Sequence, residues 1–282
     1  MNCWGLNLNN QNEHNANFPH LKKFLEVHAG IVLKEHQQYH VDRKVGPLLE
    51  EFKCTSLHAL LGVAGRNPIA MKKLIALFTI NETSFFRDIK VFHYLNKHLL
   101  PSLIEQRAKY KSFSILSAAS SAGQEAYSLG ISLYDNFPSI HDWNVSITGV
   151  DIDMNMVEKA NNGWYTQLEV QRGLPTRSLF KHFTRENRGY VVKPHLKKWI
   201  HFRQGNLFKP DVANRKYSLI CLRNVLIYFS DEDQAKLLRS MHGRLHNGGI
   251  LLLGASEIGR QIPTDCFERK QEGNIVWYQA IN

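Results

Sequence analysis

The sequence predicts an α/β protein in which a doubly wound, mainly parallel sheet follows a domain built of helices. Residues 18–100 repeat apolar side chains at helical spacing, whereas short apolar strands alternate with helical stretches after Phe113. The segment 166–198 separates the second and third expected strands and is too long for a plain helical crossover. We therefore expect a small insertion within the sheet domain.

The composition limits the classes of protein to which the chain can belong. Its 282 residues are 43% hydrophobic and 11% aromatic, enough to bury a substantial core, which excludes wholesale disorder. Lys and Arg number 35 against 25 acidic residues, a formal charge of +10 that favours an acidic partner. Nucleic acid, an anionic membrane and an acidic protein surface all meet that description, and the charge alone does not choose among them.

The sequence lacks the patterns of secreted, membrane-spanning and zinc-binding proteins. The four cysteines lie far apart without a C-x-x-C pair, so neither a zinc site nor a disulfide framework is expected. The first residues do not resemble a signal peptide, and no apolar run approaches the roughly 18 residues of a membrane span. We expect a cytoplasmic protein without a bound metal and without direct membrane insertion.

The chain is expected to begin with a tail and a helical domain. Residues 1–17 contain seven asparagines and little periodic apolar character, which indicates a mobile tail. Residues 18–100 form the predicted helical domain, and residues 101–282 form the predicted sheet domain.

The last helix of the expected helical domain contains a candidate site residue. Thr83 is suited to be its N-cap, and Pro101 is expected to end it. Arg87 lies one turn in, beside two phenylalanines. An arginine in such a place is more often exposed or ion-paired than part of a site.

The expected sheet domain contains seven strands and two further clear helices. The strands are predicted at residues 113–116, 145–150, 200–203, 217–222, 250–253 and in a closing hairpin of 267–270 and 275–278. One helix is expected at 155–162, and another from 231 to 246, ended by the Asn-Gly-Gly at 247–249.

The insertion carries most of the surplus positive charge. Residues 177–203 hold eight Lys or Arg and one acidic residue, a net charge of +7. Aromatic and β-branched residues on either side of Asn187, Arg188 and Gly189 predict a small β-hairpin. The charge suits an acidic partner, although a solvated cationic hairpin is the simpler interpretation.

Polar residues follow the expected strands. In doubly wound sheets, ligands bind outside the carboxyl ends of the strands. The candidates at those ends are Glu125, Asp151, Asn206, Arg223 and Asn224. Asp151 occupies the position at which a carboxylate binds ribose hydroxyls, although such residues also serve as helix caps.

The loop after the first strand favours a particular class of cofactor. It has one glycine, Gly123, in place of the three of a dinucleotide-binding loop, and Glu125 lies in the first turn of the following helix. A carboxylate there repels phosphate and favours a cation. S-adenosylmethionine, which has ribose, no phosphate and two positive groups, fits better than NAD or ATP. An ordinary turn between strand and helix is the alternative.

Five motifs in this order resemble the CheR-type chemotaxis receptor glutamate methyltransferases. They are residues 81–88 (NETSFFRD), 117–128 (SAASSAGQEAYS), 150–153 (VDID), 221–229 (CLRNVLIYF) and 248–257 (GGILLLGASE). The resemblance covers about residues 18–280. It implies a class I S-adenosylmethionine methyltransferase fold, that is, a Rossmann-like doubly wound sheet, with an N-terminal helical domain and a small inserted β-subdomain at residues 177–203.

The resemblance also implies which residues hold the cofactor. It places Asn81, Thr83 and Arg87 over S-adenosylmethionine, and Glu125 and Asp151 against its amino-acid and ribose parts.

Four further cofactor contacts are implied. Asn206 and Leu207 are assigned to the adenine side, and Arg223 and Asn224 to the strand end near the methyl group.

The implied reaction is methylation of glutamate γ-carboxylates on an acidic helical region of a chemoreceptor, with S-adenosylhomocysteine as product. Arg87 and Tyr228 are the implied catalytic residues, which orient the acceptor carboxylate. A carboxylate is already ionised at neutral pH, so no strong base is needed. We expect a monomer that does not bind nucleic acid. The compact turn at 184–189 argues against capture of a receptor C-terminal peptide, which some family members achieve with a longer loop.

The sequence departs from the family pattern in and before the glycine loop. Ala122, Gln124 and Ala126 replace the usual Thr, Glu and Pro, and Leu116 replaces a usual tryptophan, whereas Glu125 is retained. We expect altered cofactor affinity rather than lost binding. Methylation of RNA or of a small molecule, and a non-catalytic module that binds receptor and cofactor, are the alternative functions.

Overall fold

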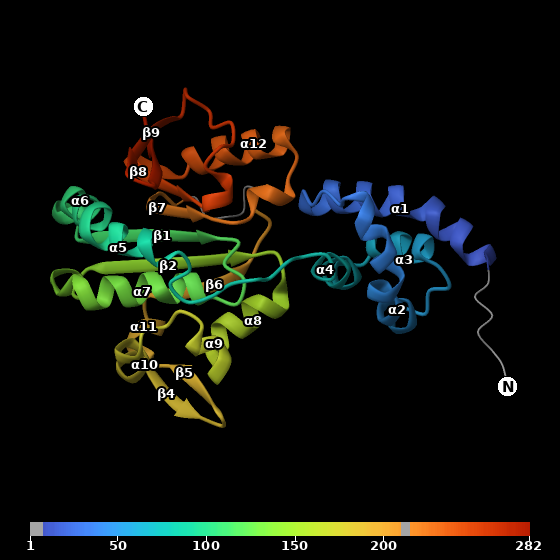
Figure 1. The fold of residues 1–282 in the computed structure, drawn as a ribbon, viewed down its shortest axis with the longest axis horizontal. Helices are drawn as coiled ribbons and strands as arrows, with labels where there is room; N and C mark the ends of the chain where they lie inside the picture. The colour runs from blue at the N-terminus through green and yellow to red at the C-terminus, as the bar shows by residue number, and fades with distance from the viewer. Residues whose placement is uncertain (1–7, 210–214) are drawn as a thin grey trace. The chain divides into compact units, whose positions relative to one another are not determined.

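The protein is described here by a computed structural model that covers residues 8–209 and 215–282 (Figure 1). The chain forms two compact units. The first comprises the helical residues up to Thr79 together with Tyr228–Ser230, and the second comprises Ile80–Ile227 and Asp231–Asn282. The division between helical and sheet regions thus lies at Thr79 rather than at the expected residue 100.

The first unit is helical, as predicted. Its helices are α1 (Leu8–Ala29), α2 (Val41–Glu51), α3 (Leu57–Ala64) and α4 (Pro68–Ala76), with a 3₁₀-helix η1 (Glu35–His40) before α2. Leu21 and Leu25, four residues apart in α1, are fully buried, which is the contact face that their spacing predicts. The backbone N–H of Val32 donates to the carbonyl of Tyr228, at 2.9 Å, within this unit.

The structure differs from the expected tail at residues 1–17. Helix α1 already begins at Leu8, so the helical segment extends further toward the N-terminus than its apolar periodicity indicated. Residues 1–7 of the expected tail lie outside the described residues.

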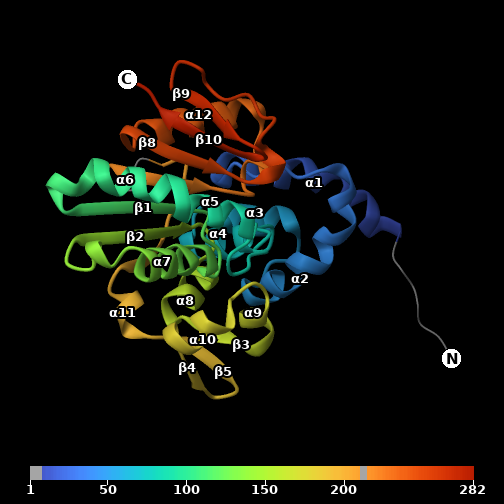
Figure 2. The same ribbon diagram turned by 60° about the vertical axis from the view of Figure 1, so that its left-hand side comes forward.

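A seven-stranded sheet forms the centre of the second unit (Figures 1 and 2). Its strands, in spatial order, are β6 (Ile200–Gln204), β2 (Asn144–Asp151), β1 (Ser112–Ala118), β7 (Tyr217–Leu222), β8 (Leu245–Leu253), β10 (Ile275–Ala280) and β9 (Phe267–Glu272). The first five are parallel, and the final hairpin adds two antiparallel strands. This confirms the predicted doubly wound α/β sheet.

The register of the parallel strands brings their carboxyl ends to one edge. Ala118 pairs with both Val150 and Leu222, and Leu222 pairs in turn with Leu253. The strand order reverses at β1, which is where doubly wound sheets open a crevice for ligands.

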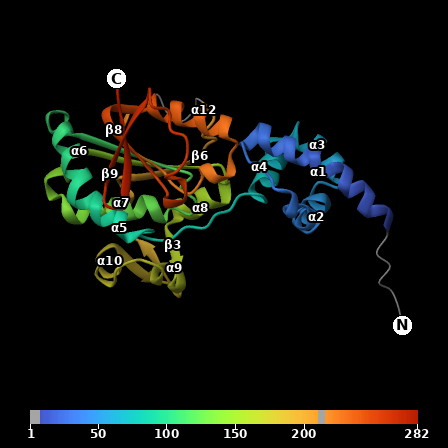
Figure 3. The same cartoon turned by 45° about the horizontal axis from the view of Figure 1, so that its top comes forward.

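The second unit also contains helices, most of which pack around the seven-stranded sheet. They are α5 (Ile89–Tyr94), α6 (Leu100–Arg107), α7 (Gln124–Asn136), α8 (Met154–Asn162), α11 (Pro194–Lys197) and α12 (Asp231–His242), whereas α9 (Gln167–Gln171) and α10 (Thr176–His182) pack on the strands of the insertion. In Figures 1 and 3, α7 and α8 lie on the opposite side of the sheet from α12.

The helix expected to run from Thr83 to Pro101 has different bounds. Phe86 and Asp88 both adopt positive φ, 46° and 62°, so α5 begins only at Ile89. Pro101 does not end the helix, because a π-helical turn at Leu95–Leu99 precedes it and α6 continues through it. Such a turn accommodates the missing N–H and the bulk of the proline ring.

The Asn-Gly-Gly at 247–249 does not terminate a helix. Helix α12 ends at His242, and β8 begins at Leu245, opposite Tyr217. Gly248 has φ of 72°, and the pairing of β7 with β8 is irregular between Tyr217 and Leu219. The glycines therefore allow an irregular strand segment rather than a helix end.

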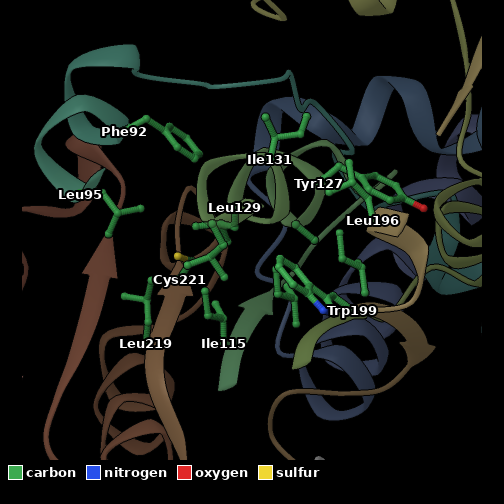
Figure 4. Packing of buried hydrophobic residues seen from close by; sticks show 14 of the residues in the cluster. Phe92, Leu95, Ile115, Tyr127, Leu129, Ile131, Leu196, Trp199, Leu219 and Cys221 are labelled. Atoms are coloured by element: carbon green, nitrogen blue, oxygen red, sulfur yellow. The ribbon is translucent and has the colours of Figure 1, made fainter. Parts of the chain in front are cut away.

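One hydrophobic cluster joins the sheet to the helices before and after β1. Figure 4 shows Leu129 and Ile131 of α7 between Phe92 and Leu95 on one side and Leu196 and Trp199 on the other. The burial of this cluster explains why the segment after Thr79 belongs to the sheet unit and not to the helical one.

The insertion forms a three-stranded antiparallel sheet in the order β3 (Trp164–Thr166), β5 (Gly189–Val192) and β4 (Phe183–Glu186). It lies beyond α7 and α8 (Figure 3). Asn187 and Arg188, with φ of 45° and 64°, form the two-residue turn between β4 and β5, as the expected hairpin requires. The Tyr165 hydroxyl donates to the carbonyl of Ala122, at 2.6 Å, which ties this subdomain to the glycine loop.

A pair of histidines, buried His182 and partly exposed His195, also connects the subdomain to α7. The Nδ1 of His182 lies 2.9 Å from the Nε2 of His195, and the Nε2 of His182 lies 3.0 Å from Asp135. Burial lowers the pKa of both histidines, although Asp135 opposes this at His182. Lys181 also donates to Asp135. A neutral His182 can donate to Asp135 while accepting from His195, which satisfies the pair without a buried charge.

We expect the free energy of unfolding to fall as the pH is lowered below about 6.5. Because both histidines have lowered pKa values when folded, the unfolded chain takes up protons first. The stabilisation is complete above the ordinary histidine pKa and is lost as the pH falls through the lowered values. Urea denaturation at a series of pH values measures this, and His182→Gln should flatten the dependence. An unchanged slope in that variant would contradict the assignment.

Candidate functional site

The loop between β1 and α7 is shaped by its glycine. Gly123 has φ of 88° and immediately precedes α7. A Cβ added to Gly123 would lie 2.8 Å from the Phe202 ring and 2.9 Å from the Cβ of Ala160. The loop therefore needs glycine for its backbone conformation and also for its close approach to β6 and α8.

Asp151 holds this loop from the end of β2. Its carboxylate, which is buried, accepts the backbone N–H of Ser121 at 2.7 Å and that of Asp153 at 2.9 Å. Burial raises the pKa of Asp151, and these backbone hydrogen bonds oppose the shift. Both oxygens retain further lone pairs, so the structural role does not prevent a contact with a hydroxyl group.

The first residues of the second unit, which begins at Ile80, are fixed to the same edge of the sheet. The Asn81 side chain donates to Asp153, at 2.8 Å, and its carbonyl accepts the Ser121 hydroxyl, at 2.9 Å. Asp153 also caps α8 by accepting the N–H of Asn155. Asn81 therefore lies against the glycine loop.

A pocket of about 310 Å³ opens beside this segment. It is lined in part by Asn81, Thr83, Ala122, Gln124 and Lys159. The structure thus brings two of the predicted cofactor residues, Asn81 and Thr83, to the same pocket as the glycine loop.

Arg223, which follows β7, is the buried centre of an ion network. Its side chain is only 3% exposed and contacts Glu125 at 3.0 Å and Asp88 at 2.6 Å. Burial disfavours the guanidinium charge, but these acids outweigh that effect and the pKa of Arg223 is raised. A third hydrogen bond, 3.1 Å long, goes to the carbonyl of Arg87. Arg223 thereby connects three segments that are distant in sequence.

Glu125 is held from two sides. One carboxylate oxygen accepts the Ser117 hydroxyl at 2.8 Å, and the other accepts from Arg223. Its side chain remains 15% exposed, so part of the carboxylate surface faces outward. The predicted acid of the first helical turn is therefore fixed at the strand ends.

The remaining predicted residues are positioned by backbone geometry. Asn206 and Leu207 follow β6, where the N–H of Gly205 donates to the carbonyl of Asp151 at 2.9 Å. Asn224 follows β7 with φ of 60°, and its backbone N–H donates to Glu257 at 2.7 Å. The side chains of Asn206 and Asn224 are both partly exposed.

The two predicted catalytic residues belong to different units. Arg87 is half-buried, and its guanidinium donates to the carbonyl of Glu82 at 3.2 Å. Tyr228 groups with the helices of the first unit. Their predicted meeting around a substrate stays a prediction.

Four residues that bind the side chain or backbone of predicted site residues have no role predicted from the sequence: Ser117, Asp88, Asp153 and Glu257. Glu257 and Asp88 stand at the ends of two of the quoted motifs, and a charged residue at a strand end was the available signal for Glu257. The sequence pattern places Asp88 inside a helix, whereas the helix begins only after it. Its contact with Arg223 is therefore not predicted.

Among the residues that the structure describes, no helix has the length and hydrophobicity needed to cross a membrane. The same residues contain no cluster of three or more His, Cys, Asp or Glu suited to hold a metal ion.

The family to which the chain belongs follows from its similarity to known proteins. Residues 81–272 match the family model described as CheR methyltransferase, SAM binding domain. The chain belongs to the CheR methyltransferase family. The matched residues begin at the segment tied to the glycine loop and include the whole ion network of Arg223.

Curated relatives cover most of the CheR-family chain. "Chemotaxis protein methyltransferase" of Vibrio parahaemolyticus is 40% identical over 87% of this chain and 90% of its own length. "Chemotaxis protein methyltransferase 1" of Pseudomonas aeruginosa is 34% identical over 94% of this chain and 98% of its own. Among solved structures, the glycopeptide N-methyltransferase MtfA with S-adenosyl-L-homocysteine is 12% identical, with a TM-score of 0.33, over 64% of this chain and 59% of that one.

The glycine loop contains polar atoms that a bound cofactor can satisfy. The Oγ of Ser120 and the Oε1 of Gln124 are buried and have no hydrogen-bond partner within the described part of the chain. Together with the outward-facing part of Glu125, they provide acceptors around the loop. This chemistry fits S-adenosylmethionine, the cofactor of the CheR family, whose ammonium and hydroxyl groups are donors.

We expect Gly123→Ala to destabilise the fold by about 1–3 kcal/mol, because a residue with a side chain must adopt positive φ there. It should also weaken binding of S-adenosylhomocysteine, since the new Cβ displaces the loop. Urea denaturation and calorimetry measure the two effects. Gly259→Ala, where nothing lies within 4 Å of the added Cβ, is the matched control. Equal behaviour of the two variants would contradict this account of the loop.

We expect Arg223→Gln to cost about 3–5 kcal/mol of unfolding free energy, because it leaves Glu125 without its buried cation. Arg239→Gln is the control, since Arg239 pairs with Asp265 on the surface and should matter little. Urea denaturation of both variants at the same pH measures the difference. Equal stability of the two variants would show that the Arg223 network does not stabilise the fold.

Proposed function

We propose that this protein transfers the methyl group of S-adenosylmethionine to γ-carboxylates of glutamates on a chemoreceptor, forming methyl esters. The chain's membership of the CheR methyltransferase family is the observation that carries the proposal. It is supported by relatives named chemotaxis protein methyltransferases, of which the chain covers 90% or more.

The cofactor is proposed to occupy the edge at the carboxyl ends of the parallel strands. Glu125 would receive its positively charged amino-acid part, because the carboxylate is fixed but partly open. Asp151 would bind the ribose, and Asn206 and Leu207 the adenine. Asn224 would lie near the reacting end, while Arg223 holds Glu125 in place.

The cofactor supplies an electrophilic methyl group, and the protein binds and orients its partners. A glutamate side chain, with a pKa of about 4.3, is already ionised and needs no base. The protein must align the attacking carboxylate oxygen with the methyl group and remove water from that oxygen. Arg87 and Tyr228 are proposed to orient the acceptor carboxylate, Arg87 because its hydrogen bond to Glu82 uses one of five donors.

The inserted subdomain is proposed to contact the acidic helical methylation region of the receptor. Arg177, Arg185 and Arg188 are exposed on it, and Phe180 is 75% exposed. Lys181 is engaged by Asp135 instead. The exposed cations would attract an acidic helix and orient its approach.

Transfer of a labelled methyl group to receptor fragments tests the function. Esters release labelled methanol in alkali, whereas methylated amines and bases do not. Alkali-labile label on glutamates is the expected result. Alkali-stable label on RNA or a small molecule, or cofactor binding without transfer, would replace the proposal with one of those functions.

We expect Arg87→Ala to lower methyl transfer by at least about a hundredfold, because the acceptor carboxylate loses its orienting cation. The fold and the affinity for S-adenosylhomocysteine should change much less. Lys90→Ala, an exposed cation three residues away, is the control. The ester assay gives the rate, and circular dichroism checks the fold. Near-normal transfer by the Arg87 variant would rule out its proposed role.

A further inference from the structure

Glu257 is a fully buried residue whose carboxylate accepts hydrogen bonds from backbone amides. It ends a short 3₁₀-helix, η6 (Ala255–Glu257), which follows β8. Its Oε2 accepts the N–H groups of Asn224 and Gly254, both at 2.7 Å. Its Oε1 accepts those of Val225 at 2.8 Å and Leu226 at 2.7 Å. One carboxylate therefore satisfies four backbone donors.

Three of these donors are consecutive residues of the loop that leaves β7. Strand β7 ends at Leu222, so their N–H groups have left the ladder of the sheet. A buried N–H without an acceptor is destabilising, and a charged acceptor forms stronger hydrogen bonds than a neutral one. Successive amides that converge on one anion need an unusual backbone, which Asn224 provides through its φ of 60°. Glu257 thus determines the path of this loop.

A second observation shows how closely the two strand ends approach each other. A Cβ added to Gly254 would lie 2.8 Å from the side-chain nitrogen of Asn224 and 2.9 Å from its backbone nitrogen. It would also lie 2.8 Å from the carboxylate of Glu257. The side chain of Asn224 is therefore confined by Gly254 as well as by the loop that Glu257 holds.

We propose that Glu257 is a positioning residue of the cofactor site, which holds residues 224–226 so that Asn224 faces the bound cofactor. This inference rests on the proposed role of Asn224. Glu257 itself is fully buried and acts through the backbone, so it is distinct from the residues proposed to contact cofactor or substrate. Because Glu257 follows β8 and Asn224 follows β7, the site depends on two strand ends rather than one.

Glu257→Gln tests the proposal with little change in size. Its amide group offers one oxygen to four N–H donors and turns a donor nitrogen toward the rest, so the loop must move. The dissociation constant for S-adenosylhomocysteine, measured by calorimetry, should rise about tenfold or more. Glu268→Gln, an exposed glutamate on β9 that pairs with Lys270, should bind normally.

Calorimetry separates positioning from mere loss of stability. Partial unfolding lowers the number of binding sites per chain and leaves the dissociation constant of the folded molecules unchanged, whereas a displaced loop raises the constant itself. Gly254→Ala is a second variant that keeps Glu257 and crowds Asn224, and it should also weaken binding. If both variants fold and bind S-adenosylhomocysteine like the parent protein, the proposal is wrong.

The measurement needs no receptor, so it is independent of the proposed ester-forming activity. If the parent protein binds S-adenosylhomocysteine but methylates no receptor fragment, the proposed function fails while the role of Glu257 is still measured. If the parent esterifies glutamates and Glu257→Gln binds and turns over normally, the positioning role alone fails.

Discussion

The backbone amides that emerge from the ends of parallel strands must find acceptors, and this constraint organises the candidate site. Asp151 receives two such amides from the glycine loop and its own strand end, and Glu257 receives four after β7 and β8. Both carboxylates are buried. Beyond the strand ends, each carboxylate accepts the backbone N–H groups that a neighbouring strand accepts within the sheet, so the loops satisfy their buried donors without further secondary structure.

The candidate site also depends on the balance of charge around Arg223. Arg223 faces two carboxylates, Glu125 and Asp88, so the charges of this group sum to one negative unit when all three are ionised. The arrangement favours a positively charged ligand and disfavours phosphate. It also explains why a helix start that ordinarily attracts anions contains an acid here.

The sequence predicts elements whose evidence is local. Strands such as Tyr217–Leu222 are short apolar runs, and the β4–β5 hairpin follows from its turn residues, so both were expected. The start of α5 was missed because Phe86 and Asp88 adopt a left-handed backbone that no local pattern requires. The contact between Asp88 and Arg223 spans 135 positions of the chain, and such a pairing depends on the folded topology rather than on spacing.

The path of the chain between the two units has a consequence for dividing the protein. Tyr228–Ser230 group with the helices that end at Thr79, although they lie deep within the sequence of the second unit. A cut between residues 79 and 80 would therefore leave the carbonyl that accepts the Val32 N–H on the other fragment. The first fragment would lack the three residues Tyr228–Ser230 of its unit, whereas the second fragment would contain its own unit complete together with those three residues. A fragment boundary at this point therefore removes a backbone hydrogen bond from the first unit.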